Sequence, residues 1–367
     1  MADISGLLDR LMVKRHQAHR KNRKYHPYTS TKRQALTTPL PPTVAAAVAQ
    51  AWAPSTHKRY EASVKEFIAF CDKQNVAEEA RLPAGELLLA TFAASLMGKM
   101  AGATIQNKIT AVKAWHTQQN ATWNGGNLLA YVLKGLERAT PEVSKQTRRP
   151  PVTAAMLKQL YEELNHEDPR DVAVYAVATT AFYGQLRLGE ICAKREAYST
   201  YNSKTHSTLK DLRPPHTRAG SRMLVIPWTK VKRTRGEEVA VTRQRGRTDP
   251  IAALDRHLKV NKITDPRMAL ISYTTANGQQ KLLTTSKFMG RCNEIWKKQG
   301  HQRFTGHSFR IGGTTHYLLN KVNPDVVRAL GRWSSSAFLR YWRQLDVLAT
   351  VHTEQMHAHS ADQIRHL

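Results

Sequence analysis

Apolar residues recur at every third or fourth position in several stretches of the chain, which is the period of an amphipathic helix. From Ser55 onward they form one such stripe, with Ser55 or Thr56 as the expected N-cap. The same period appears in residues 86–97, 104–116 and 128–136. We therefore expect residues 45–142 to form a compact helical domain.

The second half of the chain mixes helix and strand patterns. Thr153 is the expected cap of a helix that runs through Leu160, and residues 171–183 read as a long apolar helix. Residues 223–228 and 237–242 have the pattern of two strands joined by a basic turn, which predicts a β-hairpin. With helix expected for most of the rest, the fold class is mainly α with a small β-sheet, and residues 153–346 form a second domain.

Three segments lie outside these domains. Residues 143–152 are basic and end in Pro150 and Pro151, which block helix, so we expect a linker there. Residues 1–44 form a basic arm with four positive charges in residues 20–24, which suits a nuclear import signal, a phosphate-binding arm or a solvated tail. Residues 347–367 form a C-terminal tail.

The net charge of the chain indicates what kind of partner it binds. The chain has 367 residues, and 56 Lys and Arg against 28 Asp and Glu give a net charge of +28. Such an excess favours a polyanionic partner, with nucleic acid as the first candidate and a membrane surface as the second. No apolar run is long enough to span a membrane and no signal peptide is visible, so we expect a soluble, intracellular protein. The three cysteines are widely separated, which argues against a disulfide framework or a zinc site.

Four short signals follow one another in the second domain. They are Arg187-Leu-Gly-Glu190, a basic turn with Lys230, His307-Ser-Phe-Arg310, and Gly331-Arg-Trp333 followed by Tyr341. Each alone is typical of ordinary helices, and only their joint occurrence in this order within one basic domain carries weight. Arginine stays charged and its planar donors match phosphate oxygens, so two arginines could stabilise a pentacoordinate phosphorus without a metal.

In the residues and the order of these motifs the chain resembles the tyrosine recombinase (integrase) family over residues 153–343. The helical domain before them is similar to the family's core-binding domain. The motifs look most like those of Crypton-type DNA transposons and DIRS-type retrotransposons. The resemblance implies a helical core-binding (SAM-like) domain and an α+β catalytic domain that together form a C-shaped clamp on duplex DNA. One departure from the family pattern is Gln185, which separates Gly184 from the Leu-Arg pair.

The resemblance also implies the roles of the reacting groups. Tyr341 would attack the phosphodiester, form a 3′-phosphotyrosine bond and free a 5′ hydroxyl. Lys230 would protonate the departing 5′ oxygen, with Lys232 as its rival for this role. Tyr317 is a competing hydroxyl, although its position beside leucines within a helix favours packing. Because the phosphotyrosine bond conserves the energy of the diester, neither a metal nor ATP is expected as a cofactor.

The remaining catalytic candidates would surround the phosphate. Arg187 and Arg310 would hold its oxygens, and His307 would align or deprotonate the nucleophile. Trp333 stands where many relatives have histidine, and its indole N–H can donate a hydrogen bond but cannot transfer a proton. Glu190 would orient an active-site cation or histidine.

Several other cations are candidates for contact with the DNA backbone, although ordinary solvated helix faces would also explain the helical ones. They are Lys58, Arg59, Lys108 and Lys113 in the first domain, Arg148 and Arg149 in the linker, and Lys232 and Arg233 in the basic turn.

The resemblance implies four protomers on two DNA sites, strand exchange through a Holliday junction, and transfer of the tail to a neighbouring protomer. We expect excision and integration of a mobile element in the nucleus. A type IB topoisomerase and a domesticated, non-cleaving DNA-binding protein are the alternatives, and an RNA-binding protein is a weaker one. The target sequence, the state of the free protein and the choice between cis and trans cleavage stay open.

Overall fold

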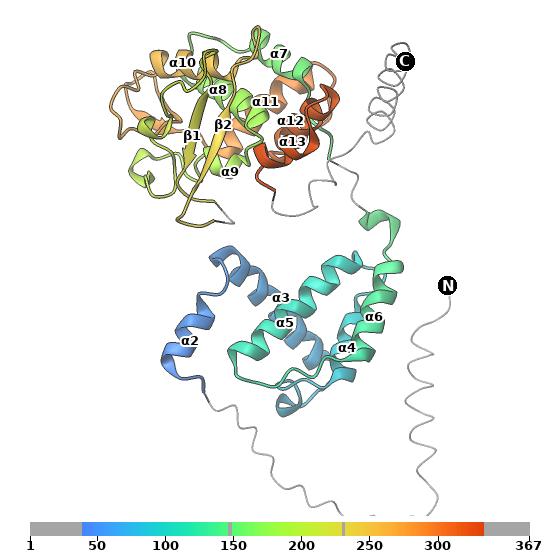
Figure 1. Ribbon diagram of the computed structural model, residues 1–367. Coiled ribbons are helices and arrows are strands. Elements are labelled where there is room, and N and C mark those ends of the chain that lie inside the picture. The colour runs from blue at the N-terminus through green and yellow to red at the C-terminus, as the bar shows by residue number, and fades with distance from the viewer. Residues whose placement is uncertain (1–38, 146–148, 230–231, 334–367) are drawn as a thin grey trace, which may run out of the picture. The chain divides into compact units, whose positions relative to one another are not determined.

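The structure, a computed structural model, describes residues 39–145, 149–229 and 232–333 (Figure 1). Contacts between backbone positions divide the chain into two compact units, Met1–Thr147 and Arg148–Leu367. The division falls within residues 143–152, the stretch that the sequence analysis assigns to a linker.

The first unit, within its described part, is built of helices joined by turns and loops (Figure 1). Its α-helices are α2 (Pro42–Ala49), α3 (Pro54–Lys73), α4 (Glu86–Ser95), α5 (Gly102–Gln118) and α6 (Asn127–Arg138), with 3-10 turns η1 (Glu78–Ala80) and η2 (Glu142–Ser144). Helix α5 packs against α3 and α6, and α4 packs against α6. The periodic segments of the sequence therefore correspond to helices, with ends that differ by a few residues.

Two expectations about helix starts in this unit are wrong. Helix α2 begins at Pro42, inside the range 1–44 assigned to the arm. Helix α3 begins at Pro54 and is preceded by Ala53 without a side-chain cap, so Ser55 and Thr56 lie within the helix. In both cases proline occupies the first turn, where its missing N–H leaves no helical hydrogen bond unmade and its fixed φ already suits the helix.

The core of the first unit lies between α3, α4 and α5. Phe67 and Phe92 meet edge to face, with ring centroids 5.2 Å apart. The buried His116 accepts a hydrogen bond from the Ala84 amide at 2.9 Å and donates one to the Val112 carbonyl at 2.8 Å. Burial lowers the pKa of His116, so its neutral form is a structural hydrogen-bonding group.

The second unit contains helices and two small hairpins. Its α-helices are α7 (Ala154–Glu163), α8 (Pro169–Tyr183), α9 (Leu188–Ile191), α10 (Pro250–Val260), α11 (Thr285–Lys298), α12 (His307–Leu319) and α13 (Pro324–Leu330). Short 3-10 turns lie at η3 (Tyr198–Thr200) and η4 (Leu209–Asp211). The expected cap of α7 is confirmed, because the Thr153 hydroxyl accepts from the Met156 amide at 3.2 Å.

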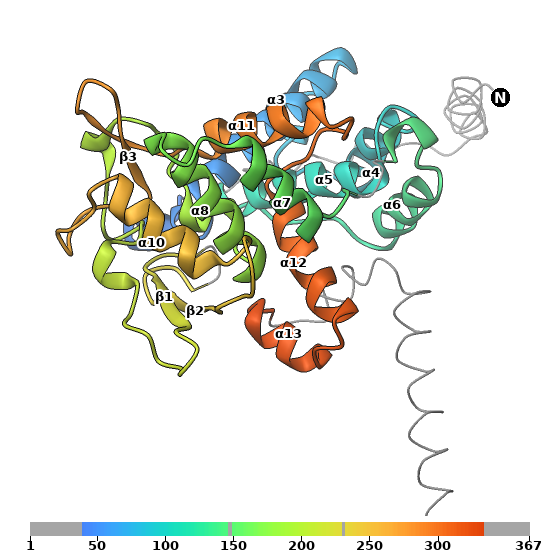
Figure 2. The same ribbon diagram turned by 90° about the horizontal axis from the view of Figure 1, so that it is seen from above.

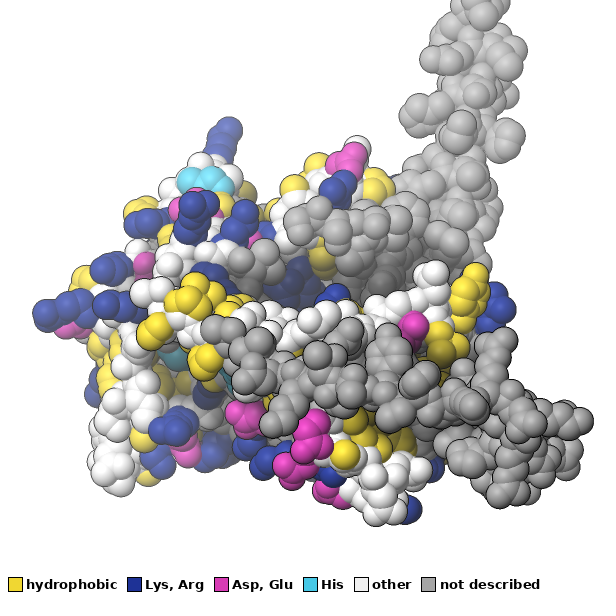
Figure 3. Space-filling model, turned by 90° about the horizontal axis from the view of Figure 1, so that it is seen from below, with side chains coloured by type: hydrophobic (Ala, Val, Ile, Leu, Met, Phe, Trp, Pro, Cys, Tyr) yellow, Lys and Arg dark blue, Asp and Glu magenta, His cyan; other side chains and the backbone are white. Residues whose placement is uncertain are grey.

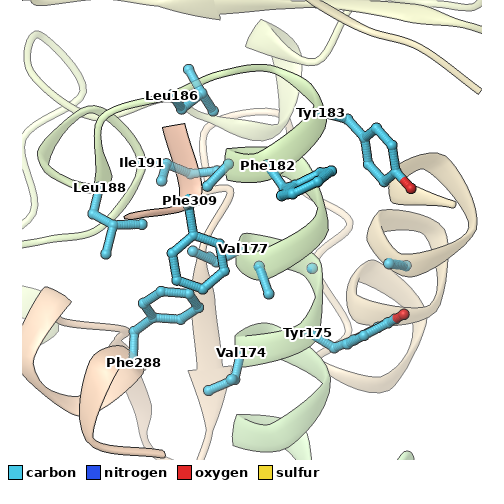
Figure 4. Packing of buried hydrophobic residues seen from close by; sticks show 14 of the residues in the cluster. Val174, Tyr175, Val177, Phe182, Tyr183, Leu186, Leu188, Ile191, Phe288 and Phe309 are labelled. Atoms are coloured by element: carbon cyan, nitrogen blue, oxygen red, sulfur yellow. The ribbon is translucent and has the colours of Figure 1, made fainter. Parts of the chain in front are cut away.

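Helix α8 is the centre of this unit. Every residue from Asp171 to Tyr183 is buried, which explains why its sequence is apolar on all sides. Helices α7, α10, α11 and α12 pack around it (Figure 2). Phe309 of α12 and Phe288 of α11 lie against one another beside α8, with centroids 5.1 Å apart (Figure 4).

Strands β1 (Arg222–Ile226) and β2 (Glu237–Val241) form the expected antiparallel hairpin, with Arg222 opposite Val241 and Ile226 opposite Glu237. A second hairpin, β3 (Ser272–Thr274) with β4 (Gln280–Leu282), was expected as part of a mostly helical region. That expectation is wrong because strands of three residues are too short to display a period of two.

Two glycines bring α12 close to its neighbours. A Cβ on Gly312 would overlap the Val152 carbonyl oxygen, and one on Gly313 would overlap the Phe182 carbonyl oxygen at the end of α8. The amide of Val152 also donates to the Ser308 carbonyl at 3.0 Å. This close approach carries Arg310, on the first turn of α12, into the interior of the unit.

All three cysteines are buried and free. Among the helices in the described residues, none is long and apolar enough to cross a membrane.

Candidate active site

Arg187 and Glu190 flank the start of α9. The Glu190 carboxylate accepts from the Arg187 amide at 3.0 Å and from Arg187 Nη1 at 2.8 Å. Both bonds follow from the local sequence, since an acidic side chain three residues into a helix reaches back to the unpaired amide at its start. The Arg187 side chain remains 35% exposed while Glu190 is 5% exposed, so the pair presents its cation outward.

Glu190 also binds a second arginine that comes from far along the chain. Arg332 Nη2 lies 2.7 Å from Glu190 Oε2, and Arg332 Nη1 lies 3.3 Å from Oε2 of Glu237, the first residue of β2. Arg332 is 9% exposed and Glu237 is 13% exposed. These ion pairs connect the start of α9, the turn end of the β1–β2 hairpin and the segment that follows α13.

Electrostatics in this cluster favour a charged Glu190. Burial alone would raise the pKa of the carboxyl group, but the charge and hydrogen bonds of Arg332 and the hydrogen bonds from Arg187 outweigh it, so the pKa lies below its ordinary value. Glu190 is therefore a fixed anion at neutral pH.

Arg310 is fully buried beside this cluster. Its Nη1 donates to the Gln185 carbonyl at 2.6 Å, and its Nη2 donates to the Gly331 carbonyl. The Trp333 ring covers the guanidinium, with its centroid 4.3 Å from Cζ. A phosphate would reach this guanidinium only after its cover, which includes the Trp333 ring, has moved.

Gln185, which departs from the family pattern, has a structural role in this site. It is buried, and its φ of 48° turns the chain sharply after α8. Its side-chain oxygen accepts from the Thr314 hydroxyl at 2.9 Å, and its amide nitrogen donates to the Val327 carbonyl at 3.4 Å. The turn that carries Arg187 is thereby attached to both α12 and α13.

The segment after α13 closes the helix with a Schellman motif. The Arg332 amide donates to the Ala329 carbonyl at 2.9 Å and the Trp333 amide donates to the Arg328 carbonyl at 3.2 Å. Arg332 occupies the left-handed position of this motif with φ 56°, a conformation that costs a non-glycine residue about 1–2 kcal/mol. A Cβ on Gly331 would overlap the Trp333 ring, so a glycine lets the indole fold back toward Arg310.

The two other candidates on α12 differ in their surroundings. His307 is the first residue of the helix and is half-buried, one turn before Arg310. Tyr317 lies deeper, donates to the Tyr183 carbonyl at 2.9 Å and lies 3.3 Å from the Thr242 hydroxyl. Burial raises the pKa of Tyr317 to about 12, so this hydroxyl is poorly suited to act as a nucleophile.

The expected nucleophile Tyr341, the expected general acid Lys230 and the linker residue Arg148 lie outside the described residues. The turn around Lys230 is described at its two sides. Thr229 and Arg233 exchange backbone hydrogen bonds, and the Lys232 amide donates to the Thr229 hydroxyl at 3.0 Å. Lys232 and Arg233 are exposed.

The cations of the first unit are not equivalent. Lys58 and Arg59 are exposed on α3, and Lys113 lies with Nζ 5.8 Å from the Trp123 ring centroid. Lys108 instead forms an ion pair with Glu66 and is 17% exposed. It is therefore the weakest candidate of the four for binding phosphate.

Basic side chains are spread over the face of the molecule in Figure 3, with fewer acidic ones among them. Arg149 is exposed at the start of the second unit. Two hollows of about 660 and 480 Å³ flank the segment from Gly189 to Lys194, directly after Arg187. Arg303 lines the first, and Arg195 and Trp228 line the second. Each hollow beside the candidate site therefore has at least two basic side chains in its lining, Lys194 among them.

Among the described residues, no three His, Cys, Asp or Glu side chains come together as a possible metal site. The structure brings together Arg187, Glu190, Arg310 and Trp333 from the sequence analysis, and it adds Gln185, Glu237 and Arg332. Arg332 lies inside the motif Gly331-Arg-Trp333, so its place in the motif was a signal, but its ion pairs depend on the fold.

The second unit's fold is that of the tyrosine recombinase catalytic domain, and solved structures of recombinases and integrases match over most of the chain. The Tn1549 transposon integrase in complex with transposon right end DNA has 14% identity and a TM-score of 0.53, with 84% of this chain and 95% of that chain covered. A lambda integrase dimer bound to a COC' core site has 12% identity and a TM-score of 0.52, with coverage of 82% and 93%.

No family model matches the sequence, and no curated protein matches it. The likeness therefore concerns the fold.

Proposed function

We propose that this chain is a site-specific DNA recombinase that cleaves and rejoins duplex DNA through a 3′-phosphotyrosine intermediate. Tyr341 is the nucleophile, and Lys230 protonates the 5′ oxygen that leaves. Religation reverses the two steps, because the freed 5′ hydroxyl attacks the phosphotyrosine and returns the proton.

One observation carries this proposal. Arg187 and Arg310, distant in sequence, are attached to the same two segments of the fold. Arg310 donates to the carbonyls of Gln185 and Gly331, and Glu190 joins Arg187 to the neighbouring Arg332. Two permanent cations that converge on one place suit the two non-bridging oxygens of a pentacoordinate phosphate.

The buried state of Arg310 gives the reaction a conformational step. DNA binding displaces the cover over Arg310, including the Trp333 ring, and a phosphate oxygen takes its place beside the guanidinium. The indole N–H then donates to the phosphate, and His307 aligns or deprotonates Tyr341. Glu190 keeps Arg187 oriented throughout, because its carboxylate holds both the amide and the guanidinium of that residue.

The finer points of the proposal concern biology and assembly. Four protomers act on two DNA sites through a Holliday junction, the two units form a clamp on the duplex, and the tail 347–367 passes to a neighbour. The element is a Crypton-type or DIRS-type transposon, and the nucleus is the place of action. The residues of the four motifs support the transposon type and the assembly, and the net charge of +28 supports DNA as the partner. Neither a metal nor ATP takes part.

The test is trapping of a covalent complex. Duplexes that carry candidate element-end sequences and a nick just 3′ of the cleavage position are incubated with the protein in EDTA and analysed on denaturing gels. Wild type should form an adduct and Tyr341→Phe should not. Tyr317→Phe is the matched control, because it removes a hydroxyl that is buried and bonded inside the fold, and it should still form the adduct.

The other outcomes separate the alternatives. Binding to the correct site without any adduct would support a non-cleaving DNA-binding protein. An adduct that leads to plasmid relaxation without recombinant products would support a type IB topoisomerase. An adduct that persists in Tyr341→Phe and vanishes in Tyr317→Phe would move the nucleophile to Tyr317.

A further inference from the structure

We propose that Arg332 is a positioning residue for DNA cleavage, which holds three segments of the active site in one arrangement. The inference rests on the proposed function and adds a residue to it. The three segments are the start of α9 with Arg187, the turn end of the β1–β2 hairpin, and the chain at Trp333. Arg332 acts through Glu190 and Glu237 and does not itself contact the phosphate.

The backbone at Arg332 is the first argument. Arginine occupies the left-handed position of a Schellman motif, where glycine is the usual residue because it has no Cβ to clash. Helices α10 and α12 end in the same motif, with Lys262 at φ 51° and Lys321 at φ 65°. Both lysines are exposed, and their side chains form no hydrogen bond or ion pair with a described residue, so only their backbone amides are bonded.

Arg332 differs from these lysines in what its side chain does. It is 9% exposed and forms two ion pairs with carboxylates, one to Glu190 at 2.7 Å and one to Glu237 at 3.3 Å. Its Nε is also buried and has no hydrogen-bond partner within the described part of the chain. Unlike the two exposed lysines, this arginine is both strained in its backbone and largely removed from solvent by its carboxylate partners, although a glycine would satisfy the backbone, and we infer that its side chain has a function.

The ion pairs explain what that function is. Glu190 binds Arg187 through one oxygen and Arg332 through the other, with the Arg187 amide sharing the second oxygen. The Arg332 charge therefore fixes the carboxylate that orients the Arg187 guanidinium. At its other end the same guanidinium holds Glu237, which stands opposite Ile226 where the hairpin leads into the turn that carries Lys230.

The chain direction at Arg332 supplies the third connection. The left-handed turn at Arg332 sends the next residue, Trp333, back over the Arg310 guanidinium. A change at Arg332 thus alters the orientation of Arg187, the turn end of the hairpin and the cover over Arg310. All three enter the cleavage step, whereas initial DNA binding depends mainly on cations spread over the surface.

The experiment compares Arg332→Gly with Lys262→Gly. Both replace a non-glycine residue at the same position of the same motif, so both relieve the same backbone strain, and only the first removes a buried guanidinium. Single-turnover adduct formation on the nicked duplex is measured at saturating DNA, beside the DNA dissociation constant and the melting temperature. Arg332→Gly should slow adduct formation about 10- to 100-fold, within the range of couplings between contacting residues. Lys262→Gly should react at the wild-type rate.

A second comparison separates positioning from folding. Glu237→Gln keeps the size of the side chain and leaves the turn after α13 intact, and we expect it to slow adduct formation about 3- to 10-fold at an unchanged DNA dissociation constant. In the Arg332→Gly background the same substitution should have little further effect, because its partner is already absent. Arg332→Lys should recover part of the rate, since lysine keeps the charge but reaches only one carboxylate well.

The outcomes are distinct. If wild type forms no adduct on a site that it binds, the proposed function fails. If wild type forms the adduct and Arg332→Gly matches it, the inference about Arg332 fails while the function stands. If Arg332→Gly melts far below Lys262→Gly, the test passes to Glu237→Gln, and a wild-type rate in that variant overturns the inference.

Discussion

Replacing Glu190 by glutamine removes one charge from the interior without changing the shape of the side chain. Three N–H donors converge on the two carboxylate oxygens: the Arg187 amide, Arg187 Nη1 and Arg332 Nη2. Glutamine offers one acceptor oxygen and an NH₂ group that cannot accept. In Glu190→Gln at least one donor therefore faces another donor.

The magnitude follows from the burial of each partner. In the Glu190→Gln variant, Arg332 is still 9% exposed but loses its ion pair with residue 190. It keeps only the longer contact of 3.3 Å to Glu237. Arg187 is 35% exposed, so solvent screens its share of the loss. Removing one partner of a buried ion pair lowers the free energy of unfolding by about 3–5 kcal/mol. Because Glu237 still pairs with Arg332, we expect a smaller loss of about 2–4 kcal/mol for Glu190→Gln.

The assay is urea unfolding of both proteins at several pH values. The folded protein holds the pKa of Glu190 below its ordinary value of 4.5, so the stabilisation from its charge is complete above that value and is lost as the pH falls through the folded pKa. The difference in free energy of unfolding between wild type and Glu190→Gln should have its full size at pH 7 and should shrink below pH 4.5.

The control is Glu294→Gln, which makes the same change at a carboxylate that is 53% exposed and pairs with Arg291 and Lys298. It should cost less than about 1 kcal/mol. The reasoning would be refuted if Glu190→Gln cost no more than this control, or if its cost were the same at pH 7 and well below pH 4.5.

Three further predictions concern glycine substitutions, and a fourth concerns the buried cysteines. Gly313→Ala should destabilise the second unit by about 3 kcal/mol in urea unfolding, because its Cβ would overlap the Phe182 carbonyl oxygen. Gly290→Ala, in α11 with open space around it, should instead stabilise by about 0.5–1 kcal/mol. Gly331→Ala should displace the Trp333 ring at a cost of about 1–3 kcal/mol, visible as altered tryptophan fluorescence before unfolding begins. Because burial raises the pKa of all three thiols, reaction with a thiol reagent at pH 8 should be slow in the native protein and fast in urea; equally fast reaction in both would contradict the burial of Cys71, Cys192 and Cys292.

Local patterns in the sequence were enough to predict most of the elements. A helix or strand is defined by a backbone period, and side chains repeat with that period, so the stripe after Ser55, the cap at Thr153 and the hairpin at 223–228 and 237–242 are visible without a structure. The short hairpin at 272–282 left no such pattern.

The types of residue that would carry the proposed chemistry were also visible in the sequence, as arginines, a histidine and a tyrosine in a fixed order. Their surroundings were decided by the tertiary structure alone. Glu237 looks like an ordinary surface charge in the sequence, Arg332 stands inside a motif without a visible partner, and Gln185 looks like a departure from the motif. They acquire their positions because the close packing of α12 on α8 brings the turn after α8, the turn end of the hairpin and the end of α13 to one place. Ion pairs and hydrogen bonds between distant segments depend on that packing, and no local period records them.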